Sequence, residues 1–340
     1  MKKDKQFYLG LDISKPFFDA SLLIVTAAGK QEIPAVQFDN DSPGIKLFEK
    51  WLKGFGVSYD ANSLVVIENT GIYHRQIWKF CSSRNLPIHI GNAAHIKWSL
   101  GITRGKSDKI DAQRLCTYGY RHRGELQCTA ALNPVFLQLK DLMTNRTRLI
   151  NQLTGLRNYL KELKKVSDKE FAKLQQQCNK AVLEGFRKSI KAIHEQIKKI
   201  IDRDKNIKNN YRLLLTVPGV GHWIALYLIC CTKNFSNGIS GKQLACYAGV
   251  VPFEHSSGIS IRGRNRVHKM ANKELKKLLH LGALAAIKYY DEFKNYYTRK
   301  KEEGKHSMTV LNAIRNKIIL RAASVVNNQQ PYVNYTSAAV

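Results

Sequence analysis

The sequence is poor in acidic residues, in long hydrophobic runs and in paired cysteines, and each shortage excludes a class of protein. No apolar run reaches the roughly 18 residues of a membrane-spanning helix. The lysine-rich N-terminus leads directly into a strand-like run instead of the apolar core of a signal peptide. The seven cysteines form neither a C-x-x-C pair nor a zinc-ligand spacing. These features predict a cytoplasmic protein with reduced thiols.

The excess of positive charge indicates the partner. The chain carries 55 Lys and Arg against 26 Asp and Glu, which gives a formal net charge of +29 over 340 residues. This charge is far larger than solubility requires, and it is the electrostatic footprint of a protein that binds nucleic acid. The chain is also long enough for two domains and a connector.

The first 125 residues alternate between strand-like and helix-like patterns. Three consecutive strands followed by α/β units predict a mixed sheet with an antiparallel first part and helices packed on it. This α/β pattern is typical of the ribonuclease H/RuvC-like fold. The expected strands are residues 7–13, 17–25, 31–37, 63–68 and 87–91, and the expected helices are 45–53, 70–83 and 107–120.

Residues 135–205 predict long helices. Leucines recur in steps of three and four up to Leu163, and apolar residues recur in nearly the same way from Val182 to Ile200. Two such stretches predict an antiparallel helical hairpin or a dimerising coiled coil, and a packed helical core without a partner is the alternative. We favour oligomerisation, because this region has no other apolar surface to cover the helices.

A third region begins near residue 211. Residues 217–221, Val-Pro-Gly-Val-Gly, lead into an apolar helix and resemble a helix-hairpin-helix, in which Gly219 and Gly221 let backbone N–H groups approach a phosphate. An ordinary helix–turn–helix packing element explains these residues equally well.

Helices then continue to about residue 327. The predicted divisions are an α/β domain (1–128), a helical coiled-coil connector (129–208), a mostly α-helical domain (209–330) and a polar tail (331–340).

Four carboxylates in three short stretches are the most informative residues of the chain. Asp12 and Glu68 each lie at the end of an apolar, β-branched run, at the rim of the sheet where ligands bind in α/β folds. Asp108 and Asp111 are three residues apart and share one face of a predicted helix. Like charges this close repel unless a cation lies between them, and such oxygen ligands suit Mg²⁺ or Mn²⁺. A single carboxylate of this kind is more often a turn, cap or surface residue. The four together predict a metal-dependent enzyme that acts on phosphodiesters.

Basic residues in two loops are candidate phosphate contacts, because arginine holds phosphate oxygens in bidentate pairs. The second loop, within residues 249–266, is also rich in Gly and Ser. A serine hydroxyl there attacks a phosphate only with help, and a loop serine is usually a turn or capping residue. The candidates for binding nucleic acid are Arg104, Lys106 and Lys109 in residues 101–109, and Arg262, Arg264, Arg266 and Lys269 in residues 262–269.

Taken in order, these motifs resemble the DEDD transposases of bacterial insertion sequences. These are relatives of the pilin-gene inversion recombinase and are understood as bridge-RNA-guided recombinases. The resemblance spans nearly the whole chain. It is carried by Gly10-x-Asp12, Glu68-x-Thr70-Gly71-x-Tyr73, Lys106-x-Asp108-x-x-Asp111, Val217-Pro218-Gly219-Val220-Gly221, Ala248-Gly249-Val250-Val251-Pro252, Ser257-Gly258 and Arg262-Gly263.

The resemblance implies a role for each of these motifs. The four carboxylates would hold the divalent metal, and Ser257 would be the nucleophile that links covalently to DNA. The family acts in the bacterial cytoplasm, at the nucleoid, on double-stranded DNA (element ends and target) chosen by a structured guide RNA. Its members assemble as dimers and tetramers, and their active site combines the carboxylates of one subunit with the serine of another.

The chain departs from the family pattern at two places, and two other functions are alternatives to transposition. Lys269-Met270-Ala271 replaces a Lys-x-Gly segment, which removes a glycine able to adopt positive φ. Ser256 stands beside Ser257 as a second possible nucleophile. The rivals are a RuvC-like, structure-selective nuclease in which water attacks, and a catalytically idle nucleic-acid-binding protein.

Overall fold

The computed structural model describes residues 5–101, 107–236, 238–252, 256–257, 261–262, 267 and 271–333. The chain divides into two compact units, Met1–Asn133 and Pro134–Val340, so the predicted helical connector falls largely within the second unit. Within the described ranges, no helix is both long and apolar enough to span a bilayer. All seven cysteines are free thiols.

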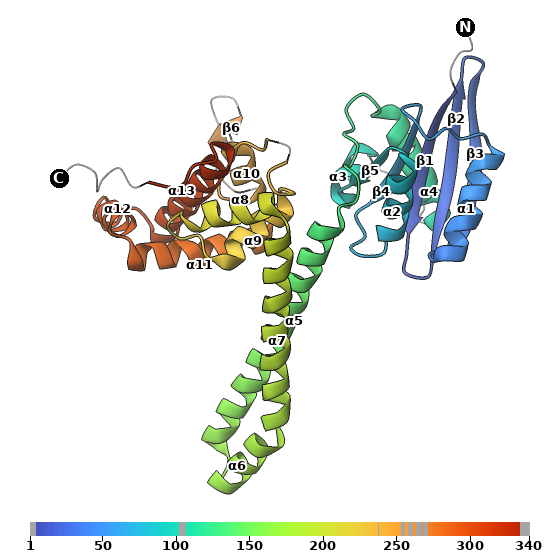
Figure 1. Ribbon diagram of the computed structural model, residues 1–340. Coiled ribbons are helices and arrows are strands. Elements are labelled where there is room, and N and C mark those ends of the chain that lie inside the picture. Colours follow the sequence, from blue (N-terminus) through green and yellow to red (C-terminus); the bar gives the residue numbers. More distant parts are fainter. Residues whose placement is uncertain are drawn as a thin grey trace. The chain divides into compact units, whose positions relative to one another are not determined.

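The first unit is built on a five-stranded mixed sheet (Figure 1). In the order β3-β2-β1-β4-β5, the first three strands are antiparallel neighbours, whereas β4 runs parallel to both β1 and β5. This mixed sheet is compatible with the expected RuvC-like domain, and the predicted strands are confirmed to within two residues. The strands are β1 (Gln6–Ile13), β2 (Phe17–Thr26), β3 (Gly29–Asp39), β4 (Ser63–Glu68) and β5 (Ile88–Gly91).

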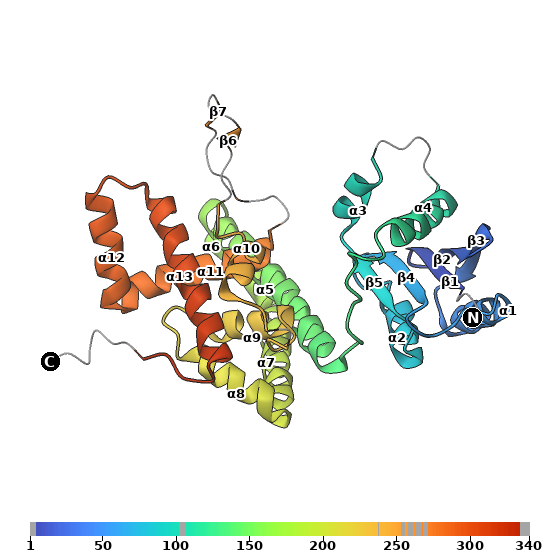
Figure 2. The ribbon, with the colours of Figure 1, turned by 90° about the horizontal axis from the view of Figure 1, so that it is seen from above.

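Helices cover both faces of this sheet, as Figure 2 shows. On one face, α1 (Ser42–Gly54) and α2 (Arg75–Arg84) bury Phe48 and Ile77 against apolar strand residues. On the other face, α3 (Ala93–Ser99) and α4 (Asp108–Arg121) bury Ile96 and Leu115. The helix predicted over 70–83 begins only at Arg75, because a turn through residues 71–74 precedes it, and α3 was not predicted.

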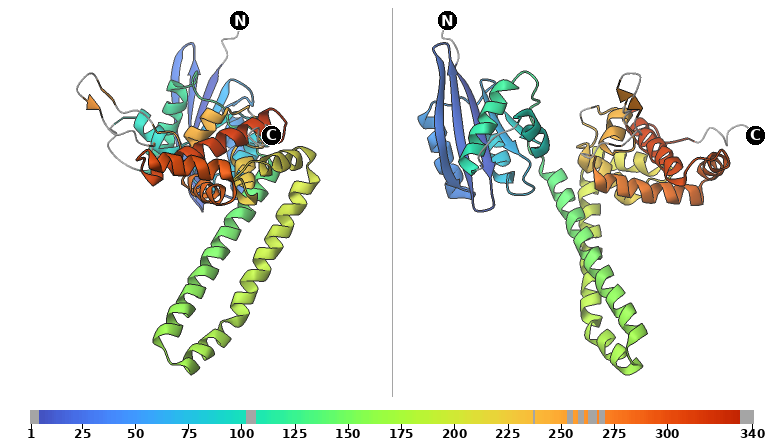
Figure 3. Two further views of the ribbon diagram at one scale, coloured as in Figure 1. Left: turned by 90° about the vertical axis from the view of Figure 1, so that its left-hand side faces the viewer. Right: turned by 180° about the vertical axis from the view of Figure 1, so that it is seen from behind.

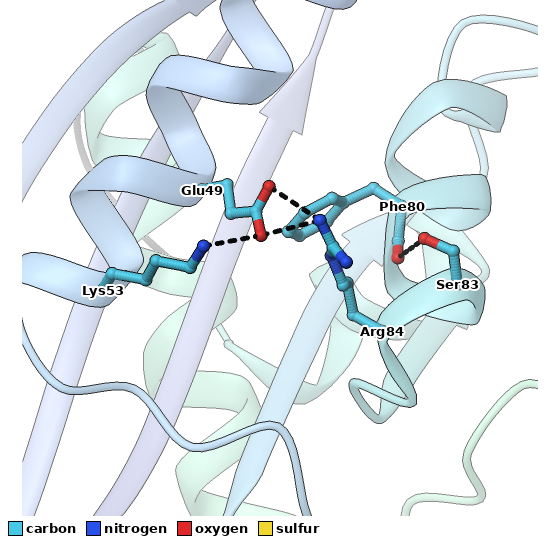
Figure 4. Close-up of polar contacts among 5 residues, drawn as sticks. All are labelled: Glu49, Lys53, Phe80, Ser83 and Arg84. Carbon is cyan, nitrogen blue, oxygen red and sulfur yellow. Dashed lines mark hydrogen bonds and ion pairs between the residues drawn. The ribbon is translucent and has the colours of Figure 1, made fainter.

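An ion pair joins α1 to α2 on the first face (Figure 4). The Arg84 Nη2 atom lies 2.9 Å from Glu49 Oε1, and Lys53 Nζ lies 3.1 Å from the same oxygen. Both cations lower the pKa of the Glu49 carboxyl, first of all through the hydrogen bond from Lys53. Exposed pairs of this kind stabilise a fold by at most about 1 kcal/mol, so the apolar core rather than this contact holds the two helices.

The second unit begins with an antiparallel helical hairpin of α5 (Pro134–Val166) and α7 (Lys180–Arg203), with α6 (Lys169–Cys178) at its turn (Figure 3). At its base, Leu139 and Ile197 belong to the core of the unit. Toward the turn, Phe171 and Leu174 are 44% and 52% exposed. The hairpin therefore has an apolar end that nothing in the described part of this chain covers.

The remaining helices pack around a core through which α13 (Ser307–Asn327) runs, with Ile314, Ile318 and Ala322 fully buried. The last helix ends at Asn327, which confirms the predicted end of the helical region. The other elements are α8 (Lys205–Leu215), α9 (His222–Cys231), α10 (Gly241–Tyr247), β6 (Ser256–Ser257), β7 (Ile261–Arg262), α11 (Lys273–Tyr289) and α12 (Asp291–Glu302).

Candidate active site

Two parallel strands bring Asp12 and Glu68 to one edge of the sheet. Asp12 is the penultimate residue of β1 and Glu68 is the last residue of β4. The register pairs Leu11 with Ile67, so the two carboxylates follow directly after this pair. Since side chains alternate along a strand, Asp12 shares its face with Tyr8, and that face is the one covered by α4.

The first turn of α4 brings Asp108 and Asp111 to the same face. Ser107 caps the helix by accepting a hydrogen bond from the Ile110 N–H at 3.4 Å. Carboxylates in a first turn are favoured by the positive end of the helix dipole. The helix approaches β1 very closely at Gly10, where an added Cβ would lie 2.1 Å from the Ala112 carbonyl oxygen. Ala112 is next to Asp111, so this contact fixes the carboxylate-bearing turn beside the end of β1.

The carboxylates are coupled electrostatically. Burial raises the pKa of Asp12 to about 6, and the charges of Asp108, Asp111, Glu68 and Asp19 add to the increase in that order. Burial also raises the pKa of Glu68, with Asp111 as the second cause. The charges of the other three predicted carboxylates therefore reach Asp12, and the charge of Asp111 also reaches Glu68.

Little in the described part of the chain neutralises this charge. Asp111 accepts a hydrogen bond from Arg114 Nη1 at 2.8 Å. Among the described residues, Asp12, Glu68 and Asp108 have no hydrogen bond or ion pair through their carboxylates, and no three His, Cys, Asp or Glu side chains are gathered closely enough to hold one ion. The donor atoms and charge thus suit a divalent cation, whereas binding one requires the side chains to draw together.

Asn40 braces the two loops that follow the carboxylate-bearing strands. Its Nδ2 atom donates to the Ser14 carbonyl at 2.9 Å and to the Tyr73 carbonyl at 3.0 Å, and its own carbonyl accepts from Gln76 Nε2 at 3.0 Å. Neither Asn40 nor Asp19 was predicted from the sequence to belong to the site. For Asp19 the sequence does carry a signal, because it is a single acid within an apolar strand.

The predicted nucleophile lies in the second unit, on a two-stranded antiparallel hairpin. Ser256 pairs with Arg262 and Ser257 pairs with Ile261. Lys109 is exposed on α4. The predicted contacts Arg104, Lys106, Arg264, Arg266 and Lys269 lie outside the described residues, as does Gly258.

The two glycines of the predicted helix-hairpin-helix have different surroundings. Gly219 has φ +84°, and an added Cβ would lie 2.8 Å from the Gly282 carbonyl oxygen, so its lack of a side chain serves packing against α11. Gly221 is the exposed N-cap residue of α9, with open space around its Cα. Both phosphate contacts stay predictions, and the geometry favours Gly221.

A mixed α/β sheet with coupled carboxylates at its edge, in a strongly basic chain, is typical of enzymes that process nucleic acid. Comparison with known proteins narrows this class. The family described as "Transposase IS116/IS110/IS902 family" matches residues 211–298, and a DEDD family of the IS110 type, described as "Transposase", matches residues 9–165.

Individual relatives agree with the family matches. The pilin gene-inverting protein of Moraxella bovis is 26% identical over 332 residues, covering 96% of this chain and 97% of the relative. Its namesake in Moraxella lacunata is 27% identical over the same length. An uncharacterised 43.6 kDa protein of insertion element IS110 from Streptomyces coelicolor is 29% identical over 141 residues, which is 40% of this chain and 35% of that protein. The chain belongs to the IS110 family of transposases, and is thus a DNA transposase or site-specific recombinase.

Proposed function

We propose that this transposase cuts and rejoins double-stranded DNA through a phosphoserine on Ser257, with Mg²⁺ or Mn²⁺ held by Asp12, Glu68, Asp108 and Asp111. The observation that carries the proposal is the coupled negative charge at one edge of the sheet, which contributes to raising the pKa of Asp12 to about 6 in a chain of net charge +29. Negative charge concentrated in so basic a protein supports a bound cation as the counter-charge.

The proposed exchange conserves bonds. Ser257 Oγ forms a bond to the scissile phosphorus as the bond to one strand oxygen breaks; the serine loses its proton, and the strand end leaves as a hydroxyl. A hydroxyl of a second DNA end then attacks the phosphoserine, which restores the serine and rejoins the strand. One ester replaces another, so neither water nor ATP is consumed. The cation, when bound, supplies positive charge that stabilises the transition state.

The basic residues position the nucleic acid in this proposal. The exposed Lys109 lies beside Asp108, and Arg262 pairs with Ser256 through the backbone. Both would hold phosphate oxygens close to reacting groups. A structured guide RNA would select the DNA by base pairing, so that the protein needs few base-specific contacts. The names of the two Moraxella relatives support site-specific DNA inversion as a reaction of the same type.

The exposed end of the helical hairpin supports a homo-oligomer. Phe171, Leu174 and Val182 are each between 44% and 52% exposed, and a coiled-coil contact with a second copy would cover them. The carboxylates and Ser257 lie in different units of the chain. A dimer or tetramer would allow one subunit's carboxylates to act with another subunit's serine. The substitution Leu174→Glu tests this contact, with the oligomeric state measured by sedimentation. Lys173→Glu is the control.

The experiment that tests the covalent step is denaturing electrophoresis of labelled element DNA incubated with protein, guide RNA and Mg²⁺. We expect Ser257→Ala to eliminate the protein–DNA adduct and recombination, and Ser256→Ala to retain at least part of both. If the adduct is lost only with Ser256→Ala, the nucleophile is Ser256 instead of Ser257. An adduct that persists when Ser256 and Ser257 are both replaced by Ala excludes attack by either serine. Cleavage by the wild type without any adduct supports the water-dependent nuclease.

A further inference from the structure

Asp19 is a fifth carboxylate at the candidate site. It lies on β2 directly opposite Asp12 on β1 in the antiparallel register. Residues directly opposite each other point to the same face of the sheet, with Cβ atoms about 4.5–5.5 Å apart. Asp19 therefore lies on the α4 face with Asp12, and its charge is among those that raise the pKa of Asp12.

The surroundings of Asp19 leave one of its oxygens unused. The residue is 1% exposed, and its Oδ2 atom accepts a hydrogen bond from Gln37 Nε2 at 3.4 Å. Its Oδ1 atom is buried and has no hydrogen-bond partner. Buried polar atoms are nearly always hydrogen-bonded, and like charges directly opposite on a sheet are destabilising. Neither the unpartnered Oδ1 atom nor the carboxylate opposite Asp12 stabilises the fold, so a carboxylate at residue 19 requires another explanation.

We infer that Asp19 is a positioning residue of the carboxylate site, whose Oδ1 atom accepts a hydrogen bond from a water molecule of the bound divalent cation. This inference rests on the cation proposed above. Gln37 holds the Oδ2 atom from the β3 side, so Oδ1 is the carboxylate oxygen that stays without a partner. Carboxylates behind a metal's direct ligands commonly orient those ligands and the metal-bound water in this way. With a residue exposure of 1%, Asp19 is too buried to contact DNA itself.

The test is cation binding by the full-length protein without DNA, measured by calorimetric titration with Mn²⁺, together with melting temperatures in chelator and in Mn²⁺. Asp19→Asn preserves the shape of the side chain and removes its charge. We expect its Mn²⁺ affinity to fall by about 10–100-fold, the range for residues behind a metal ligand. In chelator it should melt no lower than the wild type, because an uncompensated buried charge is gone. The control is Asp39→Asn, an exposed carboxylate of β3.

The possible outcomes separate a role of Asp19 from the metal site itself and from folding. Wild-type affinity in Asp19→Asn, with binding lost in Asp12→Asn, overturns the role of Asp19 and leaves the proposed metal site intact. Unchanged affinity in both variants overturns the metal site itself. A lower melting temperature of Asp19→Asn in chelator assigns Asp19 to folding alone. If that variant does not fold, Gln37→Ala decides: we expect weaker Mn²⁺ binding than in Gln31→Ala, which alters another exposed glutamine of β3, and equal binding overturns the inference.

Discussion

Gly10 on β1 packs directly against the backbone of Ala112 on α4. A Cβ added to Gly10 would lie 2.1 Å from the Ala112 carbonyl oxygen and 2.4 Å from the Cys116 nitrogen. Both obstacles are backbone atoms, so no side-chain rotation relieves the clash. The helix must move away from the sheet, and the carboxylates of its first turn move with it.

We therefore expect Gly10→Ala to lower both stability and cation affinity. Overpacking of this kind typically costs about 1–3 kcal/mol in the free energy of unfolding, measured here by denaturant titration. Gly54→Ala in α1 is the control, because an added Cβ there meets no atom within 4 Å. Equal stability and equal Mn²⁺ affinity of the two variants would contradict the role assigned to the Gly10 contact.

Asp108→Asn should abolish strand cleavage and leave nucleic-acid binding largely unchanged, because the substitution removes a proposed metal ligand without removing a phosphate contact. We expect cleavage to fall by at least about a hundredfold, the upper end of the loss caused by altering residues behind a metal ligand. Cleavage and gel-shift assays on the same preparations separate the two activities. Asp39→Asn serves as the control, and full cleavage by Asp108→Asn in chelator-treated buffer would exclude the metal mechanism.

The metal-free protein should lose stability as the pH rises from about 4 to about 6. The pKa of Asp12 is raised from 3.8 to about 6 in the folded protein. Over this interval the folded state retains a proton that the unfolded state has released, so raising the pH favours unfolding. Asp12→Asn removes this contribution and should be more stable than the wild type above pH 6, with the difference vanishing near pH 4. Thermal melts in chelator at a series of pH values measure this stability difference. A difference that does not change with pH would refute the raised pKa of Asp12.

Nucleic-acid binding should depend steeply on salt. Each phosphate neutralised by Lys or Arg releases condensed counterions, so the logarithm of affinity falls linearly with the logarithm of salt concentration. For six or more contacts the affinity for duplex DNA should drop by about a thousandfold or more between 50 and 200 mM salt. Fluorescence anisotropy gives the slope. A flat titration would mean that the charge of +29 is only a solvated surface.

The sequence by itself determined the strands, the carboxylates and the partner. Strand periodicity predicted all five strands of the first unit, because apolar β-branched runs bounded by turns have few other solutions. Asp12 and Glu68 were recognisable as strand-end acids, and the excess of Lys and Arg indicated nucleic acid. The α3 helix was missed because seven residues are too few to show a helical period.

Only the tertiary structure decided how these residues meet. The register of β1 with β2 places Asp19 opposite Asp12, and a shift of one residue would move Asp19 to the other face of the sheet. The contact of Gly10 with Ala112 joins segments about a hundred residues apart, and Asn40 links two loops through carbonyl groups that no side-chain pattern reveals. Local periodicity fixes which face a side chain takes within its own element. The neighbours that determine its charge and burial come from other elements, and only the folded chain brings them together.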